Sequence, residues 1–189
     1  MDHDLRSALE DAGCMRRYDL LYLAHTGAAT TVRPAPGPTI EDVTEATLAE
    51  CEIARIKAFA DSEEEPDAAE VAENLISLRL DLQSGNRYLI GRLGPDAAAT
   101  AGWDEGPDRL VFNLATRVPF RNQGIARHLL SYMIANTYEE GRKSITIFTD
   151  PTDSPVQFYR RMGFTEEVYW QARYVYTPTN GMDYFIPLR

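Results

Sequence analysis

The sequence predicts one mixed α/β domain of the α+β kind, in which helices cover a sheet. Runs of β-branched and aromatic residues alternate along the chain with runs whose apolar residues recur at helical spacing. Glycine and proline residues separate these runs and mark the turns between them. The chain has 189 residues, of which 44% are hydrophobic, and this is enough to build one core.

The first 38 residues are expected to carry one helix, one strand and a linker. Residues 4–13 show a short amphipathic pattern that ends at a glycine, and residues 14–25 form a strand-like run. Residues 27–38 are rich in Gly, Pro, Ala and Thr, a composition typical of a linker. We therefore distinguish an N-terminal part, residues 1–38, that packs on the same domain as residues 39–189.

Two helices are expected before the central strands. Residues 39–43 predict a short strand, and Thr44 is placed to cap the helix that follows. The predicted apolar face of that helix comprises Leu48, Ile53, Ile56 and Phe59. An acidic loop, residues 61–67, leads to a second helix, whose predicted inward face comprises Val71, Leu75, Leu78 and Leu82.

The second half of the chain is expected to supply most of the sheet. Strands are predicted at residues 87–93, 97–103, 109–116, 143–150, 166–176 and 182–188. Gly94-Pro95-Asp96 forms the turn between the first two. A long helix over residues 125–140 and a short one over residues 155–162 complete the order, and Ser154 is placed to cap the short one.

The composition argues against several classes of function. The net charge of −10, from 29 acidic and 19 basic residues, disfavours nonspecific nucleic-acid binding, which needs a basic surface. The charge is compatible with a cationic substrate, and it equally serves solubility. No apolar run reaches the length of a membrane span, and the first residues lack a signal-peptide pattern. We therefore expect a soluble, cytoplasmic protein without membrane contact.

The cysteines and histidines indicate neither a metal site nor a nucleophilic triad. Cys14 and Cys51 lie far apart and outside any ligand spacing, so two free buried thiols are expected. His3, His25 and His128 are scattered along the chain. We expect no bound metal.

The segment Arg121-Asn122-Gln123-Gly124-Ile125-Ala126 carries the clearest functional signal. It joins a strand-like run to a helix, so the first backbone N–H groups of that helix point outward, unpaired and partly positive. Its glycine would let a phosphate approach the backbone closely. A GxxxxGK[ST] loop is absent, and a GxGxxG fingerprint needs more glycines than the segment has. The remaining pattern, Arg/Gln-x-x-Gly-x-Gly/Ala, is matched at each specified position.

At this motif the sequence resembles the GNAT superfamily of N-acetyltransferases. The similarity extends over residues 109–170, about a third of the chain. The stretch "ATRVPFRNQGIARHLL" is similar to the acetyl-CoA motif of that family, and "SPVQFYRRMGF" is similar to its second motif. The resemblance implies a GNAT-like twisted sheet, mixed but mostly antiparallel and flanked by helices, with the N-terminal helix and strand as additions. It also implies acetyl-CoA as the cosubstrate.

The resemblance further implies which residues hold acetyl-CoA. The pyrophosphate would lie on the turn formed by Arg121, Asn122, Gln123, Gly124, Ile125 and Ala126. The pantetheine arm would follow the backbone of a splayed strand at Thr116, Arg117 and Val118, with Asp153 and Ser154 near it. From the residues alone, Arg121 could instead pack its stem on Phe120, and residues 116–118 could pair as an ordinary strand.

The resemblance gives Tyr159 as the general acid that protonates the departing thiolate. The alternative for this residue is an aromatic ring that packs in the core. The general base stays unassigned, because the strand at residues 110–116 offers Asn113 as its polar candidate, and an amide cannot act as a base. Asp104 and Glu105, which precede that strand, could reach the cleft or lie in a solvated turn.

We therefore expect an N-acetyltransferase that passes acetyl from acetyl-CoA directly to a primary amine of a small molecule, within a ternary complex. The alternatives are transfer of a longer acyl group, acetylation of a protein N-terminus or lysine, and an acyl-CoA-binding sensory or regulatory module without turnover. The acidic loop at 61–67 could attract a cationic amine or be solvated surface. Tyr169, Trp170 and Tyr174 could line the acceptor pocket or the core. No nucleic-acid partner is expected, and the protein would be a monomer or a homodimer.

Overall fold

The computed structural model describes residues 14–25, 27, 37–106, 108–151, 155–176 and 184–186. In these ranges it contains the following elements, in chain order: β1 (Cys14–His25), β2 (Thr39–Asp42), α2 (Leu48–Phe59), α3 (Ala68–Gln83), β3 (Arg87–Leu93), β4 (Asp96–Trp103), β5 (Arg109–Thr116), η1 (Val118–Phe120), α4 (Ile125–Glu139), β6 (Ile145–Thr149), α5 (Pro155–Arg161), β7 (Glu166–Tyr176) and β8 (Tyr184–Ile186). This order and the mostly antiparallel pairing confirm the predicted mixed α/β class. The helix expected at residues 4–13 and most of the linker expected at 27–38 lie outside the described residues.

The chain forms two compact units. One comprises His25–Ile147, and the other joins Met1–Ala24 with Phe148–Arg189. Strand β6 begins in the first unit and ends in the second. The domain boundary expected after residue 38 stays a prediction.

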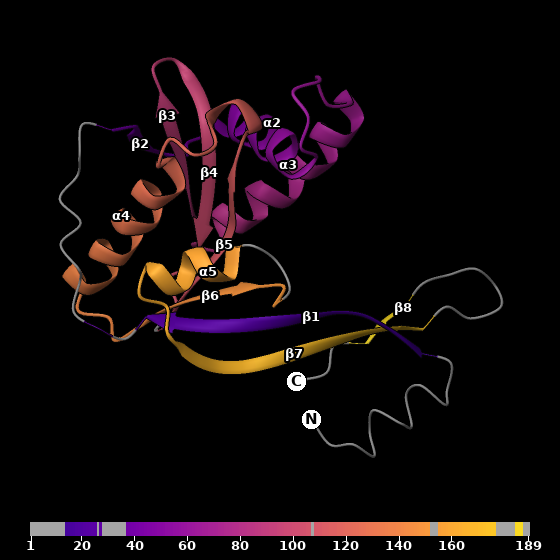
Figure 1. The fold of residues 1–189 in the computed structure, drawn as a ribbon. Helices are drawn as coiled ribbons and strands as arrows, with labels where there is room; N and C mark the ends of the chain where they lie inside the picture. The colour runs from indigo at the N-terminus through magenta and orange to yellow at the C-terminus, as the bar shows by residue number, and fades with distance from the viewer. Residues whose placement is uncertain are drawn as a thin grey trace. The chain divides into compact units, whose positions relative to one another are not determined.

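The unit His25–Ile147 is a sheet with helices on both faces. Strands β2, β3, β4 and β5 pair in an antiparallel series, and β6 joins β5 in parallel. Helices α2 and α3 lie on one side of β3 and β4, and α4 lies on the other (Figure 1). The α4 side packs closely, because a Cβ on Gly91 of β3 would lie 3.0 Å from Ile125 and 3.1 Å from Leu129.

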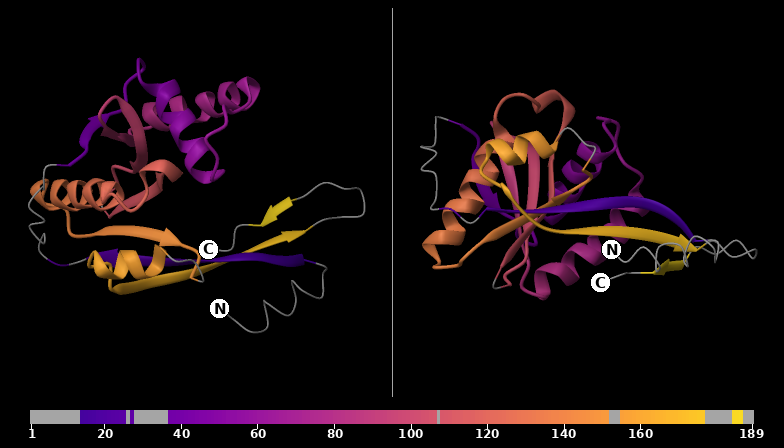
Figure 2. Two further views of the ribbon diagram at one scale, coloured as in Figure 1. Left: turned by 45° about the horizontal axis from the view of Figure 1, so that its top comes forward. Right: turned by 60° about the horizontal axis from the view of Figure 1, so that its bottom comes forward.

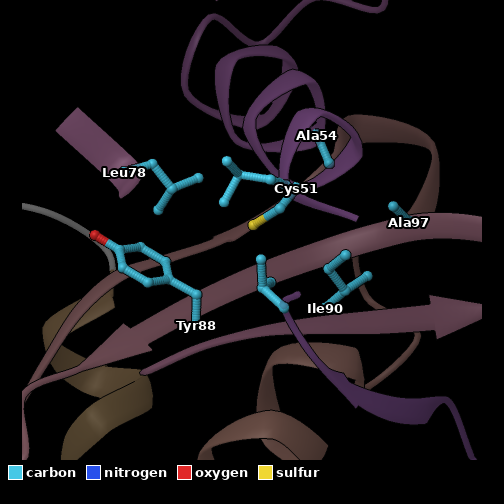
Figure 3. Close-up of a cluster of buried hydrophobic side chains, with 8 residues drawn as sticks. Cys51, Ala54, Leu78, Tyr88, Ile90 and Ala97 are labelled. Atoms are coloured by element: carbon cyan, nitrogen blue, oxygen red, sulfur yellow. The ribbon is translucent and has the colours of Figure 1, made fainter. Parts of the chain in front are cut away.

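The core under α2 and α3 is formed by side chains from both helices and two strands. Its buried members are Val43, Leu48, Cys51, Ala54, Leu78, Tyr88, Ile90 and Ala97. Figure 3 shows the Tyr88 ring at the edge of this cluster, with its hydroxyl directed to the side from which Leu78 of α3 enters. The inward positions Leu75, Leu78 and Leu82, predicted from helical spacing, are confirmed.

Helix α2 begins later than the sequence predicts. Its N-cap is Thr47, and the prediction of Thr44 in that place is wrong. Thr47 N donates to the Thr44 carbonyl and Thr44 N donates to Thr47 Oγ1, each at 3.0 Å, so a turn occupies these polar groups before the helix starts. The buried apolar face is accordingly Leu48, Cys51, Ala54 and Ala58. Phe59, which was expected to point inward, is 58% exposed.

The second unit pairs the two ends of the chain. Strand β1 runs antiparallel to β7 along most of its length, and β7 pairs with β8 in the same sense (Figure 2). The additional N-terminal strand is thus bound to a C-terminal strand of the same unit. No helix in the described part of the chain is both long and apolar enough to cross a membrane.

Candidate functional site

The connection between β5 and α4 forms an exposed turn at a helix start. Gly124 is the N-cap of α4 with a φ of +79°, no side chain caps the helix, and its first turn holds no acidic residue. Residues 121–124 are exposed, and a Cβ on Gly124 would meet no heavy atom within 4 Å. An open, uncapped helix start carries partial positive charge and can hold an anion such as a phosphate.

The turn is braced from within. The Gln123 side chain donates from Nε2 to the Pro119 carbonyl at 3.0 Å. Asn122 adopts a φ of +61°, and His128 N bonds to the Gly124 carbonyl at 3.0 Å to begin the helix. With its side chain used inside the turn, Gln123 can offer an anion its backbone N–H.

Strand β5 leaves β6 before it reaches the turn. The parallel ladder contains three residue pairs and ends where Val111 meets Ile147, whereas pairing with β4 continues to Thr116. Among the described residues, β5 has no strand partner on the β6 side beyond that point. A register shift between Thr100 and Gly102 places a β-bulge opposite them, where Asn113 has a φ of +52°. Within the described residues, the backbone of residues 112–116 therefore pairs with a strand on its β4 side and has no strand pairing on the other.

Arg121 is held by protein groups and does not extend freely over the turn. Its Nε donates to the Thr116 carbonyl at 3.0 Å, and its Nη2 donates to the Ala58 carbonyl at 3.1 Å. The same Nη2 forms an ion pair with Asp61. Arg121 thus connects the turn to the loop that follows α2, and the unpaired N–H groups at the start of α4 add partial positive charge at the turn.

Arg117 lies over the Phe120 ring with its guanidinium, whereas the alternative expected for Arg121 was packing of its stem on that ring. Its guanidinium carbon lies 5.1 Å from the centroid of the Phe120 ring. It also forms an ion pair with Glu63 and donates to the Ala97 carbonyl at 3.1 Å. Sequence reasoning identified the acidic loop but missed these pairings, because no local pattern relates residues more than 50 positions apart.

Most acids of the loop at 61–67 have partners in their own unit. Besides Asp61 and Glu63, Glu65 pairs with Lys57 at 2.5 Å, and Asp67 caps α3 by accepting from two backbone N–H groups. The acids of the loop are thus exposed, and pairing neutralises most of their charge.

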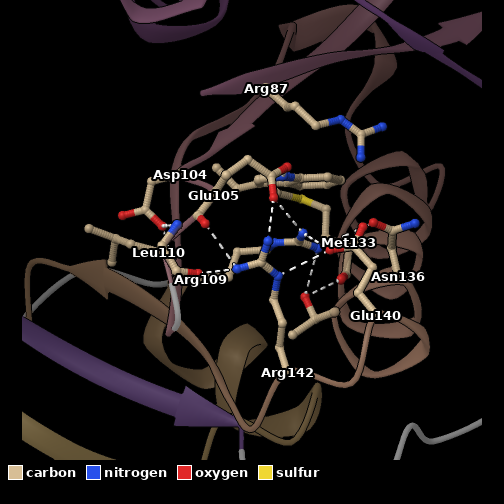
Figure 4. A network of polar contacts seen from close by, with 12 residues as sticks. Arg87, Asp104, Glu105, Arg109, Leu110, Met133, Asn136, Glu140 and Arg142 are labelled. Carbon is tan, nitrogen blue, oxygen red and sulfur yellow. Dashed lines mark hydrogen bonds and ion pairs between the residues drawn. The ribbon is translucent and has the colours of Figure 1, made fainter. Parts of the chain in front are cut away.

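Asp104 and Glu105 also have structural contacts. Asp104 Oδ1 accepts from Leu110 N at 2.9 Å and closes the turn before β5. Glu105 pairs with Arg109 at 3.0 Å and with Arg142 at 2.6 Å, in the network that Figure 4 shows. The contacts of Asp104 are those of a turn, and a role as base stays a prediction for both carboxylates.

Tyr159 lies on α5, in the second unit. Its side chain is 7% exposed, and its ring lies 5.4 Å from that of Phe158 and 6.4 Å from that of Phe164. These contacts agree with the alternative expected for Tyr159, an aromatic ring that packs in the core. Its role as general acid stays a prediction. Asp153, Ser154 and the side chains of Tyr169, Trp170 and Tyr174 lie outside the described residues.

Cys51 is free and buried, and burial raises the pKa of its thiol to about 12. The side chain of Cys14 lies outside the description. Within the described ranges, no group of three or more His, Cys, Asp and Glu side chains could hold a metal ion.

The fold and the turn together define an α/β protein whose exposed helix start is suited to an anion. Residues 86–166, which contain this turn, match the family of acetyltransferase (GNAT) domains. This segment of the chain is a GNAT acetyltransferase domain, and the resemblance inferred from the two motifs is confirmed. The GNAT family uses acetyl-CoA.

Solved structures support the same fold. A putative GNAT-family acetyltransferase from Novosphingobium aromaticivorans matches with a TM-score of 0.58 and 18% identity, over 85% of this chain and 62% of that one. A GCN5-related N-acetyltransferase from Sphaerobacter thermophilus matches with a TM-score of 0.60 and 20% identity, over 92% of this chain and 55% of that one. The chain thus spans less than two thirds of the length of either relative.

A third structure contains a ligand. A predicted acetyltransferase from Clostridium acetobutylicum, solved with acetyl-CoA, matches with a TM-score of 0.54 and 18% identity, over 70% of this chain and 92% of that one. A comparison with curated proteins gives no match.

Proposed function

We propose that the protein is an acetyl-CoA-dependent N-acetyltransferase that passes acetyl directly to a primary amine of a small molecule, within a ternary complex. The observation that carries this proposal is the exposed, uncapped start of α4 behind an Arg-x-x-Gly-x-Ala turn, inside the segment that matches the GNAT family. The open space beside Gly124 leaves room for a phosphate at that position.

Each part of the turn has a distinct task in this proposal. The backbone N–H groups of Gln123, Gly124 and Ala126 bind the pyrophosphate, and Asn122 and Ile125 shape the turn and the first helical residue. Arg121 positions the turn through its contacts with Thr116 and the loop after α2.

The strand before the turn holds the rest of the donor. The pantetheine arm lies along the free edge of β5, which the missing β6 pairing leaves available, and continues past Thr116, Arg117 and Val118. Acetyl-CoA supplies an activated acetyl group as a thioester, and a backbone N–H at that edge stabilises the negative charge on the carbonyl oxygen. Tyr159 provides the proton for the leaving thiolate.

The test is release of free CoA from acetyl-CoA in the presence of a panel of primary amines, measured with Ellman's reagent. Background from Cys51 is expected to be small, because its buried thiol has a raised pKa. Release that depends on both acetyl-CoA and an amine supports the proposal. Absence of release with every amine, together with measurable CoA binding by titration calorimetry, contradicts turnover.

That second outcome corresponds to an acyl-CoA-binding module without turnover. One observation favours this alternative: Asp104 and Glu105, the acids nearest in sequence to the expected cleft, are bound in structural contacts. The alternative loses its support if another carboxylate accepts the proton of the amine.

A further inference from the structure

A polar cluster lies on the α2 and α3 side of the sheet, beside the bulge of β5. Tyr88 of β3 donates from its hydroxyl to Asp81 Oδ2 of α3 at 2.6 Å. The side chain of Asn113, at the bulge, lies near enough to act on this hydroxyl: burial and Asp81 raise the pKa of Tyr88, and Asn113 opposes them. Arg55 of α2 lies close enough to interact with the hydroxyl and pairs with Glu52 at 2.5 Å.

Three members of this cluster occupy locally unfavourable positions. Asp81 places a negative charge in the last turn of α3, where the helix dipole disfavours it and no basic residue compensates. Asn113 has a left-handed φ within a strand, and the Glu52 side chain is buried with 1% exposure. Local rules of this kind are broken most often where a function requires it.

Asp81 differs from the other charged members of the cluster in its ion pairing. Glu52 and Arg55 neutralise one another. In the described part of the chain, no ion pair reaches Asp81, and no hydrogen bond reaches its second oxygen, Oδ1. A buried tyrosine hydroxyl needs an acceptor, but a neutral amide would serve as well. The half-buried Asp81 carboxylate therefore keeps its negative charge without an ion-pair partner among the described residues, and its Oδ1 can accept a further hydrogen bond or a proton.

The position of the cluster fits the proposed reaction. Asn113 belongs both to this cluster and to the bulge, and the free edge of β5 begins beside it. The ring of Phe112, its neighbour on β5, packs edge-on against Tyr88 at 5.4 Å. The strand whose edge would hold the acyl group thus contributes Phe112 and Asn113 to the surroundings of Tyr88, the residue that contacts Asp81.

We infer that Asp81, supported by Tyr88 and Asn113, binds the acceptor as its ammonium ion and takes its proton. Asp81 Oδ1 accepts one proton from R–NH₃⁺, and the neutral nitrogen attacks the thioester carbonyl carbon. The C–N bond forms as the C–S bond breaks, and the second proton that the nitrogen loses balances the one that the CoA thiolate gains. The protonated Asp81 then returns its proton to water. This inference rests on the proposed function and assigns the base that the sequence left open.

The test compares Asp81→Asn with Glu73→Gln, which removes one charge from an exposed position on the same helix. Asparagine keeps an acceptor for Tyr88, so the packing is retained. n-Butylammonium chloride should produce saturable amide shifts around Asn113 in the wild-type protein, measured by NMR against potassium chloride of equal ionic strength. Its affinity should fall at least about tenfold in Asp81→Asn and stay unchanged in Glu73→Gln.

Turnover provides the second readout. With n-butylamine as acceptor, Asp81→Asn should lower kcat by about 100-fold while the acetyl-CoA Kd stays within twofold. Asp81→Glu, which keeps the carboxylate, should recover part of the loss. Absence of saturable shifts in the wild-type protein, or an unchanged kcat in Asp81→Asn, would overturn the inference. The wild-type protein could bind n-butylammonium at Asp81 while no amine of the panel causes release of CoA. In that case the proposed function fails and the ammonium site stands.

Discussion

Gly124 shows how one residue can set the chemistry of a helix start. Its left-handed φ of +79° turns the chain into α4, and its missing side chain leaves the space outside the helix open. Asn and Asp adopt this backbone region more readily than other side chains do. A pair of substitutions can therefore separate the charge at this position from the backbone strain.

We predict that Gly124→Asp abolishes measurable CoA binding while Gly124→Asn weakens it less, by a difference of at least about tenfold. Both variants carry the same backbone cost, but the aspartate also repels the pyrophosphate, and nearby charges interact by ~1–4 kcal/mol at such distances. Titration calorimetry with CoA measures the difference, and circular dichroism checks the fold. A Gly124→Asp protein that binds CoA as the wild type does would remove this glycine from the site.

Tyr159 is the residue for which packing and catalysis must be separated. Phenylalanine keeps the ring contacts with Phe158 and Phe164, so Tyr159→Phe should lower kcat by about 10²–10⁴-fold with little change in acetyl-CoA affinity. Tyr138→Phe is the control, since it removes a hydroxyl that donates to the His25 carbonyl. Equal rates for the two variants at saturating substrates would leave Tyr159 as a packing residue.

At the scale of elements, the sequence predicts the strands well because their signals are local. Strands β1, β3, β5 and β7 begin and end at the predicted residues, where alternating apolar positions meet turn residues. The predicted start of α2 is wrong. Thr44 and Thr47 both suit an N-cap, and a turn between them decides which residue begins the helix. Local spacing carries no information about such competition.

The candidate site was predictable only in part, for the same reason. The turn at 121–126 was found from its own residues, and the confirmed family accounts for it. The ion pair of Arg121 with Asp61 joins positions 60 residues apart, and the contact of Tyr88 with Asp81 depends on how α3 meets β3. These contacts follow from tertiary packing, which no sequence motif encodes.

The loop after α2 leads to a prediction about the cofactor site. Glu63→Gln should tighten CoA binding by up to about fivefold at low salt, because it releases the Arg117 guanidinium near the turn. The turn itself should persist, since Arg117 keeps its contacts with Ala97 and Phe120. The gain should vanish at high salt, where exposed charges are screened.

Glu64→Gln is the matched control for the loop. It removes the same charge one residue away, and no ion pair in the described part of the chain involves Glu64. Its CoA Kd should equal that of the wild type in calorimetry at both salt concentrations. Equal tightening in both variants would mean that the overall charge of the loop matters and that the pairing with Arg117 does not. Steering of a cationic amine by the loop stays a prediction, and the pairing of its acids reduces the field available for it.

Although the whole chain has a net charge of −10, one of its arginines is buried within a network of ion pairs. The Arg109 side chain is fully buried, and a buried arginine needs partners for its charge. It pairs with Glu105 at 3.0 Å and Glu140 at 2.7 Å, and its guanidinium lies 4.5 Å from the centroid of the Trp103 ring (Figure 4). The network joins the end of β4, the start of β5 and α4, which together position the strand and helix on either side of the turn.

We predict that Arg109→Met destabilises the protein by about 2–3 kcal/mol. A fully buried pair that loses one partner costs ~3–5 kcal/mol, and the value here is lower because the side chains of Glu105 and Glu140 are 30% and 38% exposed and can be hydrated. Arg79→Met is the control, because its pair with Glu45 is exposed on both sides and should change stability by less than about 0.5 kcal/mol. Urea denaturation followed by circular dichroism measures both. Equal midpoints for the two variants would show that packing around Trp103, and not the buried charge network, holds α4 to the sheet.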